Sequence, residues 1–313
     1  MVTTDIYGHI AQNNRKIVGL ILLFPVALLG FIYLFFFLFA LCDEAPLAQT
    51  MADFNEVFLS FVPILLVVCA GLTLLSFSTG DKMMLKFAGA ELCPNDKAHL
   101  QVYRTVENLA LKAGIPTPAV YLIPDDSLNA FATGYSPNKA SIALTTGIVK
   151  KLTPIELEAV VSHEIAHIIN RDIRLNMFII TGLGVIGMVG EILLRSTQRQ
   201  RSSNNKKGNG AVLLLVIGLA LLLFRYLIAP FIHMAVSRSQ EYQADAAGAY
   251  LTRHPAALAS ALKKVSADPR VEALDASSEM ACACIYNPLK NMKGLLDTHP
   301  PVKERIKRLE SMV

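Results

Sequence analysis

The stretch TPIELEAVVSHEIAHIIN, residues 153–170, has the pattern of one capped α-helix. Thr153 can cap the first turn, Pro154 stands at the first helical position, and Glu156 completes a capping-box pattern. Apolar residues recur through the rest of the stretch. The sequence therefore predicts a helix that runs from Pro154 to about Asn170.

His163 and His167 are four residues apart in this stretch, so they share one face of the predicted helix. Two imidazoles in this arrangement can bind a single zinc ion. Glu164 lies at the edge of the same face, where it can accept a proton from a metal-bound water. Apolar neighbours argue against an exposed polar helix, because buried polar groups need partners. The pattern predicts the site of a zinc-dependent hydrolase.

A catalytic zinc site needs a third protein ligand. The extended pattern that supplies it from the same segment requires glycine at position 170 and histidine at position 173, but the chain has Asn170 and Ile173. Glu241 and Asp245 are the best candidates, since they are four residues apart in a predicted helix. One carboxylate can bind zinc while the other accepts a hydrogen bond from an imidazole. The alternative is a solvated acidic face of that helix.

The chain is too apolar for an ordinary soluble domain. Of its 313 residues, 53% are hydrophobic, and its mean hydropathy is +0.44. Residues 17–41 and 57–77 contain no charged side chain, and each stretch can cross a bilayer core of about 30 Å. The first stretch is too long for a cleaved signal peptide and lacks a cleavage site before Cys42. We therefore interpret residues 1–81 as an N-terminal transmembrane hairpin, with both ends cytoplasmic by the positive-inside rule.

A second hydrophobic hairpin is predicted over residues 175–236, with apolar stretches at about 177–194 and 211–236. Charges at Glu191 and Arg225 interrupt it. The loop between the stretches is basic and lacks acids, so a crossing pair would violate the positive-inside rule. Two interpretations stay open: a hairpin that crosses the membrane, or, slightly favoured, one that enters it or covers the active site without crossing.

The remaining residues, 82–174 and 237–313, are sufficient for one globular domain that the second hairpin divides. A helix is predicted from Asp96 to a stop at Gly114. Strands are predicted at residues 119–123, 130–135 and 140–146, the last two joined by a turn. The predicted fold class is α+β, mostly helical, with a small β-sheet in a multi-pass membrane protein.

Four segments, together with the two apolar hairpins, resemble the M48 family of membrane zinc metallopeptidases, in particular its bacterial HtpX-like branch. They are, in order, NAFATG at 129–134, HEIAH at 163–167, EYQAD at 241–245 and THPP at 298–301. The resemblance extends over nearly the whole chain. It implies a zincin domain of the gluzincin type.

The resemblance also implies the role of each matching residue. One zinc ion per chain would bind His163, His167 and Glu241. Glu164 would be the general base. Asp245 would not bind the metal itself but would orient one of its ligands through a hydrogen bond.

Two further roles follow from the resemblance alone. His299 would stabilise the tetrahedral oxyanion, and the alternative is a histidine packed between a helix start and two prolines. An edge strand would pair with the substrate main chain, which explains broad sequence tolerance. In this chain its substrate-binding residues are Asn129, Ala130, Phe131 and Ala132.

The implied activity is hydrolysis of peptide bonds, with misfolded or damaged membrane proteins as substrates, in quality control and stress response. The implied location is the bacterial cytoplasmic (inner) membrane, with the site facing the cytoplasm. Self-cleavage is compatible with this activity, and no feature supports nucleic-acid binding. A catalytically silent scaffold would be expected to lack a ligand or the base, and all are present. A transporter relay through Glu191, Arg225 and His233 is disfavoured, because the chain shows no paired repeats.

Overall fold

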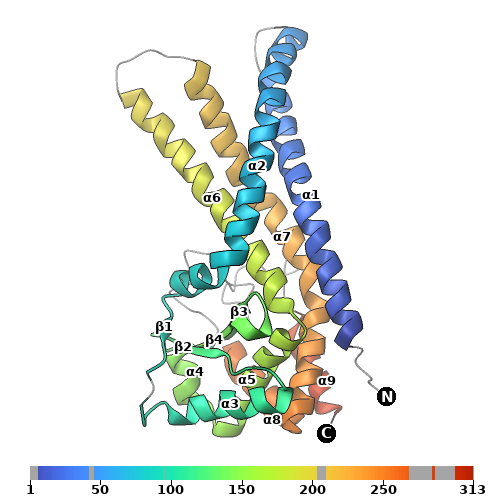
Figure 1. Ribbon diagram of the computed structural model, residues 1–313, viewed down its shortest axis with the longest axis vertical. Helices are drawn as coiled ribbons and strands as arrows, with labels where there is room; N and C mark the ends of the chain where they lie inside the picture. The colour runs from blue at the N-terminus through green and yellow to red at the C-terminus, as the bar shows by residue number, and fades with distance from the viewer. Residues whose placement is uncertain are drawn as a thin grey trace. The chain divides into compact units, whose positions relative to one another are not determined.

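The computed structural model describes residues 6–41, 46–94, 96–202, 209–267, 284–285 and 300–312 (Figure 1). The chain divides into two compact units, each of which is discontinuous in sequence. The first unit comprises residues 1–14, 77–181 and 230–313, and the second comprises residues 15–76 and 182–229.

The second unit is built from parts of four long helices, namely α1 (Ile6–Ala40), α2 (Leu47–Phe87), α6 (Asp172–Ser202) and α7 (Asn209–Thr252). Aromatic rings join α1 to α7 inside the unit. The ring of Phe224 makes edge contacts with Phe24 and Phe31, at centroid distances of 5.7 and 5.5 Å. Many other apolar side chains of the unit are exposed, as expected for helices that face lipid.

Within the described residues, three helices are long and apolar enough to cross a membrane, at Asn13–Leu38, Val62–Phe87 and Asp172–Thr197. Each overlaps one of the first three apolar stretches of the sequence. The fourth predicted stretch, residues 211–236, lies in α7, where the apolar helical segment Leu214–Leu227 is shorter. The number of crossings stays a prediction.

The first unit contains a four-stranded sheet in the order β1-β2-β4-β3. The strands are β1 (Glu91–Leu92), β2 (Ala119–Ile123), β3 (Ala130–Gly134) and β4 (Ala140–Thr145). The central pair β2–β4 is parallel, and β1–β2 and β3–β4 are antiparallel. The three strands expected from the sequence are confirmed to within a residue, with the short helix η1 (Pro137–Lys139) in the predicted turn. The two-residue β1 is too short for a sequence signal.

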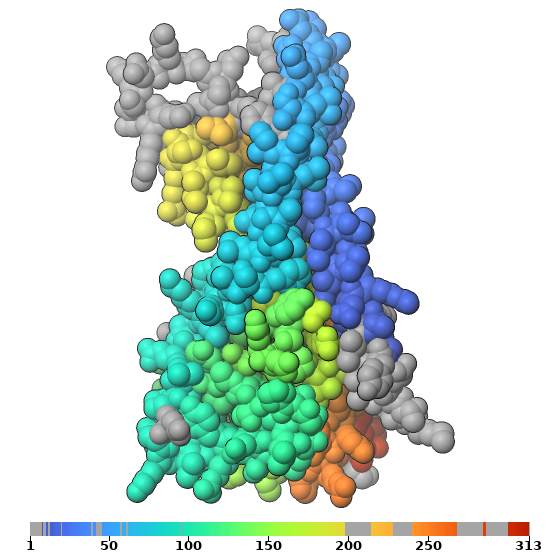
Figure 2. Space-filling model, viewed as in Figure 1, coloured from blue at the N-terminus to red at the C-terminus, as the bar shows by residue number. Residues whose placement is uncertain are grey.

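Alternate side chains of the sheet enter two different clusters. Ala130 and Ala132 of β3 lie in the larger core with α3 (Leu100–Ala113), α5 (Pro154–Ile169) and α8 (Pro255–Ala267). Phe131 enters the smaller cluster on the other face, with Met84 from α2 and Met177 from α6. Small residues on the first face allow the close approach of α5 to β3. Figure 2 shows one face of the molecule, on which cyan to green segments form much of the first unit's surface.

Helix α5 forms as its sequence predicts. The Thr153 hydroxyl accepts a hydrogen bond from the Glu156 N–H, and the Glu156 carboxylate accepts one from the Thr153 N–H, so both halves of the capping box are present. The predicted helix after Asp96 begins later, at Leu100, and the Asp96 carboxylate accepts a 3.0 Å hydrogen bond from the His99 N–H in the turn before it. It ends before Gly114, which is left-handed as expected.

Helix α7 continues without a break from the apolar segment into the segment that carries Glu241 and Asp245. It packs closely on α5 at Gly248, whose carbonyl accepts a 3.1 Å hydrogen bond from the Ser162 hydroxyl. A Cβ at Gly248 would lie 3.1 Å from the His163 backbone nitrogen. Among its described residues, the first unit also contains α4 (Thr146–Lys151) and α9 (Val302–Glu310), of which α9 contacts α8.

Candidate metal centre

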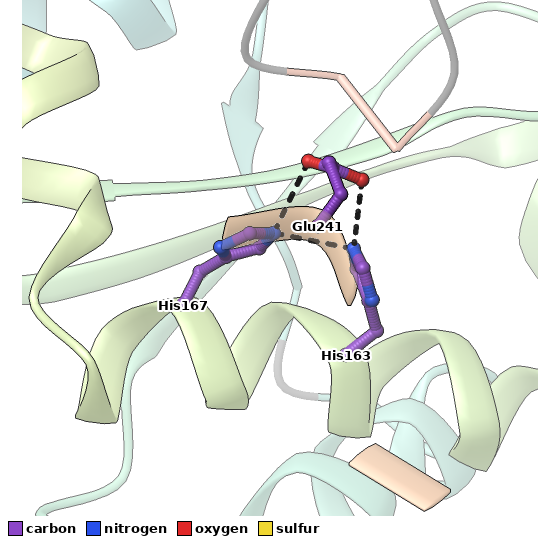
Figure 3. Close-up of side chains that lie close together, drawn as sticks. All are labelled: His163, His167 and Glu241. Atoms are coloured by element: carbon purple, nitrogen blue, oxygen red, sulfur yellow. Dashed lines mark hydrogen bonds and ion pairs between the residues drawn. The ribbon is translucent and has the colours of Figure 1, made fainter. Parts of the chain in front are cut away.

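Two histidines of α5 and one glutamate of α7 bring their side-chain donor atoms together (Figure 3). The Nε2 atoms of His163 and His167 are 3.2 Å apart. The Glu241 carboxylate lies above both rings, with Oε1 3.6 Å from His167 Nε2 and Oε2 3.7 Å from His163 Nε2. All three residues are buried. The structure thus brings together the three residues that the sequence analysis assigned as metal ligands.

A carboxylate orients each imidazole from the side away from this cluster. Asp245 Oδ1 lies 3.1 Å from His163 Nδ1, and Asp172 Oδ2 lies 3.0 Å from His167 Nδ1. An ionised carboxylate only accepts hydrogen bonds, so each Nδ1 carries a proton, and in the neutral form of each ring Nε2 presents a lone pair. If both imidazoles are neutral, two lone pairs face each other at 3.2 Å and repel, and either a proton on one Nε2 or a metal ion between them removes the repulsion. The tautomers therefore fit a metal ion.

The charges of the buried cluster also fit a cation. Four carboxylates lie in it, each no more than 6% exposed, and Arg305 is the basic side chain that faces Asp245 and Glu241. The carboxylates are those of Glu164, Asp172, Glu241 and Asp245. Buried charge that is not compensated is costly, so this excess of negative charge suits a divalent ion.

The two histidines have opposite tendencies to hold a proton. Burial lowers the pKa of His163, and the nearby His167 lowers it further, although Asp245 opposes both effects. Burial also acts against a charged His167, but Asp172 and Glu241 outweigh it and raise its pKa to about 9. In the absence of metal a proton therefore resides on His167, where a metal ion has to displace it.

Arg305 of α9 joins the carboxylates of this centre. Its guanidinium is fully buried and donates to both oxygens of Asp245, from Nε at 2.8 Å and from Nη2 at 2.7 Å. Its Nη1 lies 2.9 Å from Glu241 Oε2 and donates to the Ile285 carbonyl at 3.2 Å. Although burial works against the ionised carboxyl, Arg305 and the His163 hydrogen bond hold the pKa of Asp245 below its usual range.

Glu164 has the properties of a general base. It is 1% exposed, and burial raises its pKa to about 7, with Glu241 adding to the effect and His167 and the Ala132 N–H opposing it. Within the described part of the chain, no hydrogen-bond partner reaches Glu164 Oε1. A buried carboxylate oxygen held in this way, beside a metal site, is available to take a proton.

The outer edge of β3 faces this carboxylate. Antiparallel pairing with β4 alternates, so that Ala130 and Ala132 turn their backbone groups away from β4. The Ala132 N–H donates to Glu164, and the Ala130 carbonyl accepts a 2.8 Å hydrogen bond from the Ile285 N–H. The Asn129 side chain accepts from the Ala130 N–H. Phe131 points its side chain to the far face of the sheet and its backbone groups toward Ala143 of β4, so neither is available at this edge.

The structure places Asp245 beside His163, as the sequence analysis expected, and Glu164 beside the cluster. His299 lies outside the described residues. Sequence reasoning missed Asp172 and Arg305. Asp172 is five residues after His167 and had the ordinary signature of an acidic helix start. Arg305 lies in a basic segment with Lys303, Lys307 and Arg308, and nothing in that sequence singles out the one that is buried.

Comparisons with known proteins agree with this geometry. Residues 96–313 match Peptidase family M48. A "Protease HtpX homolog" from Bacteroides fragilis (strain YCH46) is 36% identical over 312 residues, covering 96% of each chain. One from Thermoanaerobacter pseudethanolicus is 35% identical over 317 residues, covering all of this chain and 99% of that protein.

A third, from Listeria monocytogenes serotype 4a, is 36% identical over 322 residues, covering 98% of this chain and all of that protein. The crystal structure of S. mikatae Ste24p matches 98% of this chain and 67% of its own, at 20% identity and a TM-score of 0.44, a likeness too low to bear on the details of the site. The family match over more than half of the chain, and the similarity to these proteases along its whole length, show that it belongs to peptidase family M48, a family of metalloproteases.

Proposed function

We propose that this chain is a zinc-dependent endopeptidase of a cell membrane that hydrolyses peptide bonds of membrane proteins. The observation that carries the proposal is the convergence of two imidazole Nε2 atoms and the Glu241 carboxylate, with the buried Glu164 beside them. Two imidazoles and one carboxylate are a common protein donor set of catalytic zinc. With bonds of about 2.0–2.1 Å, tetrahedral zinc needs donors about 3.3 Å apart. The two Nε2 atoms are 3.2 Å apart, and one donor atom from each of the three residues lies within 4.8 Å of the other two.

One zinc ion held by His163, His167 and Glu241 would supply an activated water and a Lewis acid for the scissile carbonyl. Glu164 would take the proton of the attacking water and return it to the leaving amine. Its raised pKa favours this exchange near neutral pH, and the positive charge of a bound ion would lower that pKa again. Asp172 and Asp245 would keep both histidines in the tautomer that the metal requires.

The substrate main chain would add to the outer edge of β3, next to Glu164. The Ala132 backbone lies closest to the base, because its N–H already contacts that carboxylate. Pairing at Ala130 requires that Ile285 first release the Ala130 carbonyl. Recognition of main-chain groups, which every peptide has, would give broad sequence tolerance. The proposed role of His299 in stabilising the oxyanion rests on the resemblance of the THPP segment alone.

The proposed cellular setting is the bacterial inner membrane, with the metal centre on the cytoplasmic side. Three apolar helices of sufficient length support insertion. Arg15 and Lys16 before the first of the predicted spans, and Lys82 and Lys86 after the second, support a cytoplasmic position for both ends of that hairpin. Substrates would be damaged membrane proteins, removed under stress, and the chain itself is a further substrate if a second copy presents an extended segment.

The test is zinc content and casein cleavage by the purified full-length protein in detergent, compared with Glu164→Gln. The variant should keep about one zinc per chain and lose cleavage by at least about a hundredfold, because the base contributes on the order of 10²–10⁴. Glu158→Gln, on the same helix but half-buried beside Lys112, is the matched control and should cleave as wild type does. Equal cleavage by Glu164→Gln and wild type, or a wild-type protein without zinc, would contradict the proposal and favour a scaffold role.

A further inference from the structure

An asparagine of the first helix reaches the turn between the two helices at the metal centre. Asn13 lies near the start of α1, in the part of that helix that belongs to the first unit, and is 5% exposed. Its Nδ2 donates to the Asn170 carbonyl at 3.0 Å and to Asp172 Oδ1 at 2.7 Å. Its Oδ1 accepts from Gln240 Nε2 at 3.1 Å. The amide orientation is fixed, because a carbonyl and an ionised carboxylate can only accept.

Both acceptors flank a strained residue. Arg171, between the end of α5 and the start of α6, has φ of 61°, a left-handed conformation that residues other than glycine seldom adopt. Such a conformation persists only where the surroundings impose it. Asn13 bonds the carbonyl before this residue and the carboxylate after it, so it holds the turn from both sides.

The turn sets the orientation of a metal ligand. Asp172 uses Oδ1 for Asn13 and Oδ2 for His167 Nδ1, so the Asn13 bond fixes the rotation of the carboxylate that orients the histidine. On the other side, Gln240 is adjacent in sequence to Glu241. Through Gln240, Asn13 links the helix that carries Glu241 to the turn after the helix that carries both histidines.

We propose that Asn13 is a positioning residue of the metal centre, which aligns His167 through Asp172 and sets the approach of Glu241 through Gln240. The inference rests on the proposed zinc site and goes beyond it in one respect. The first residue of the candidate span Asn13–Leu38 supports the metal centre, so the start of this helix is more than a membrane anchor. The buried amide is fully paired, with two donated bonds and one accepted bond, as a group with such a role requires.

The experiment measures zinc affinity by competition with a chelator, using full-length protein in detergent. Asn13→Ala should raise the zinc Kd by about tenfold, the lower end of the range for partners of metal ligands. Gln240→Ala, which removes one bond from the opposite side of the bridge, should raise it by a smaller factor, about threefold. Asn14→Ala is the matched control. Asn14 is the next residue on α1, and its side chain accepts a 3.3 Å hydrogen bond from Arg174 and does not touch the cluster. Its Kd should stay within about twofold of wild type.

A second readout separates positioning from a general loss of stability. In the cobalt-substituted protein the visible absorption bands report the ligand geometry. They should shift in Asn13→Ala and Gln240→Ala but not in Asn14→Ala, with all proteins well below their melting temperatures. Unchanged Kd and spectra in a folded Asn13→Ala overturn the inference while leaving the zinc site in place. If Asn13→Ala does not fold, Gln240→Ala decides by the same two readouts. A wild type that binds no zinc removes both this inference and the proposed function.

Discussion

Arg305 and Asp245 form a buried two-point ion pair, with Nε–Oδ2 and Nη2–Oδ1 distances of 2.8 and 2.7 Å. The arrangement uses the planar fork of arginine, which lysine cannot reproduce. Because Asp245 also faces His163 Nδ1, the pair connects helix α9 with the first of the proposed metal ligands. The third guanidinium nitrogen of Arg305, Nη1, lies 2.9 Å from the Glu241 carboxylate.

Replacement of Arg305 by methionine should therefore be severe. It leaves two buried carboxylates without their counter-charge, a loss of about 3–5 kcal/mol when one partner of a buried pair is removed. We expect a melting temperature lower by several degrees and a zinc Kd raised at least tenfold. Arg305→Lys should recover the charge but not both bonds, and so should fall between wild type and Arg305→Met. Arg308→Met, an exposed arginine above the Tyr242 ring on the same helix, is the control, and equal effects of the two changes would contradict the assignment.

Asp172→Asn should weaken metal binding with little change in side-chain shape. Asp172 accepts from two donors, Asn13 Nδ2 and His167 Nδ1. An asparagine at this position has to turn its own NH₂ toward one of them, so one of the two bonds is lost. The expected rise in zinc Kd is about 10–100-fold, measured by chelator competition. Asp126→Asn, a highly exposed aspartate near Lys150, should leave the Kd unchanged. A wild-type Kd in Asp172→Asn would show that the carboxylate does not orient His167.

The capping glutamate of α5 should make stability depend on pH. Burial disfavours its charge, but hydrogen bonds from Lys264, the Thr153 N–H and Ser260 lower the pKa of Glu156 from 4.5 to about 2. A carboxyl group whose pKa is lower in the folded than in the unfolded chain stabilises the fold at pH values above its unfolded pKa. The contribution of Glu156 is therefore present above about pH 4.5 and is lost as the pH falls toward 2. It is on the order of 2 kcal/mol, allowing for screening of the half-exposed Lys264.

Thermal melting of Glu156→Gln in detergent should therefore show a lower melting temperature than wild type at pH 7, with the difference shrinking toward pH 3. Glu158→Gln, two residues further along the same helix, should lower stability by less than about 1 kcal/mol at either pH, since both partners of the Lys112 pair are partly exposed. A gap between Glu156→Gln and wild type that stays constant across this range would mean that the charge of Glu156 does not contribute.

Gly248→Val should separate the two ligand-bearing helices. A Cβ at this position meets the His163 nitrogen and the Ser162 hydroxyl at 3.1 Å, and the backbone cannot give way as a flexible side chain can. Overpacking of this kind costs about 1–3 kcal/mol. Gly248 is seven residues, about two helical turns, from Glu241, so the shift should also reach the third ligand and raise the zinc Kd.

Gly182→Val provides the comparison, because a Cβ there meets no atom within 4 Å. It should bind zinc as wild type does. Melting and zinc titration of both variants decide the matter, and a Gly248→Val protein with wild-type affinity would show that the close approach does not position Glu241.

The sequence by itself determined the local elements and the candidate ligands. Thr153, Pro154 and Glu156 specify the start of α5 through contacts within one turn, and the spacing of His163 and His167 fixes their common face through helix geometry. The strands of the hairpin and the apolar helices follow from patterns that are also local. Glu241 and Asp245 were found as a pair, but spacing alone left open which of them faces the metal.

Only the tertiary structure decided which polar side chains support these ligands. Asn13, Asp172 and Arg305 come from three different helices, and each is buried because distant segments converge on it. No periodicity distinguishes Arg305 from the exposed basic residues beside it, or Asp172 from an ordinary helix-capping acid. Burial and hydrogen-bond direction are properties of the packed chain. They fix the histidine tautomers and the raised pKa of Glu164, and local sequence patterns cannot encode either one.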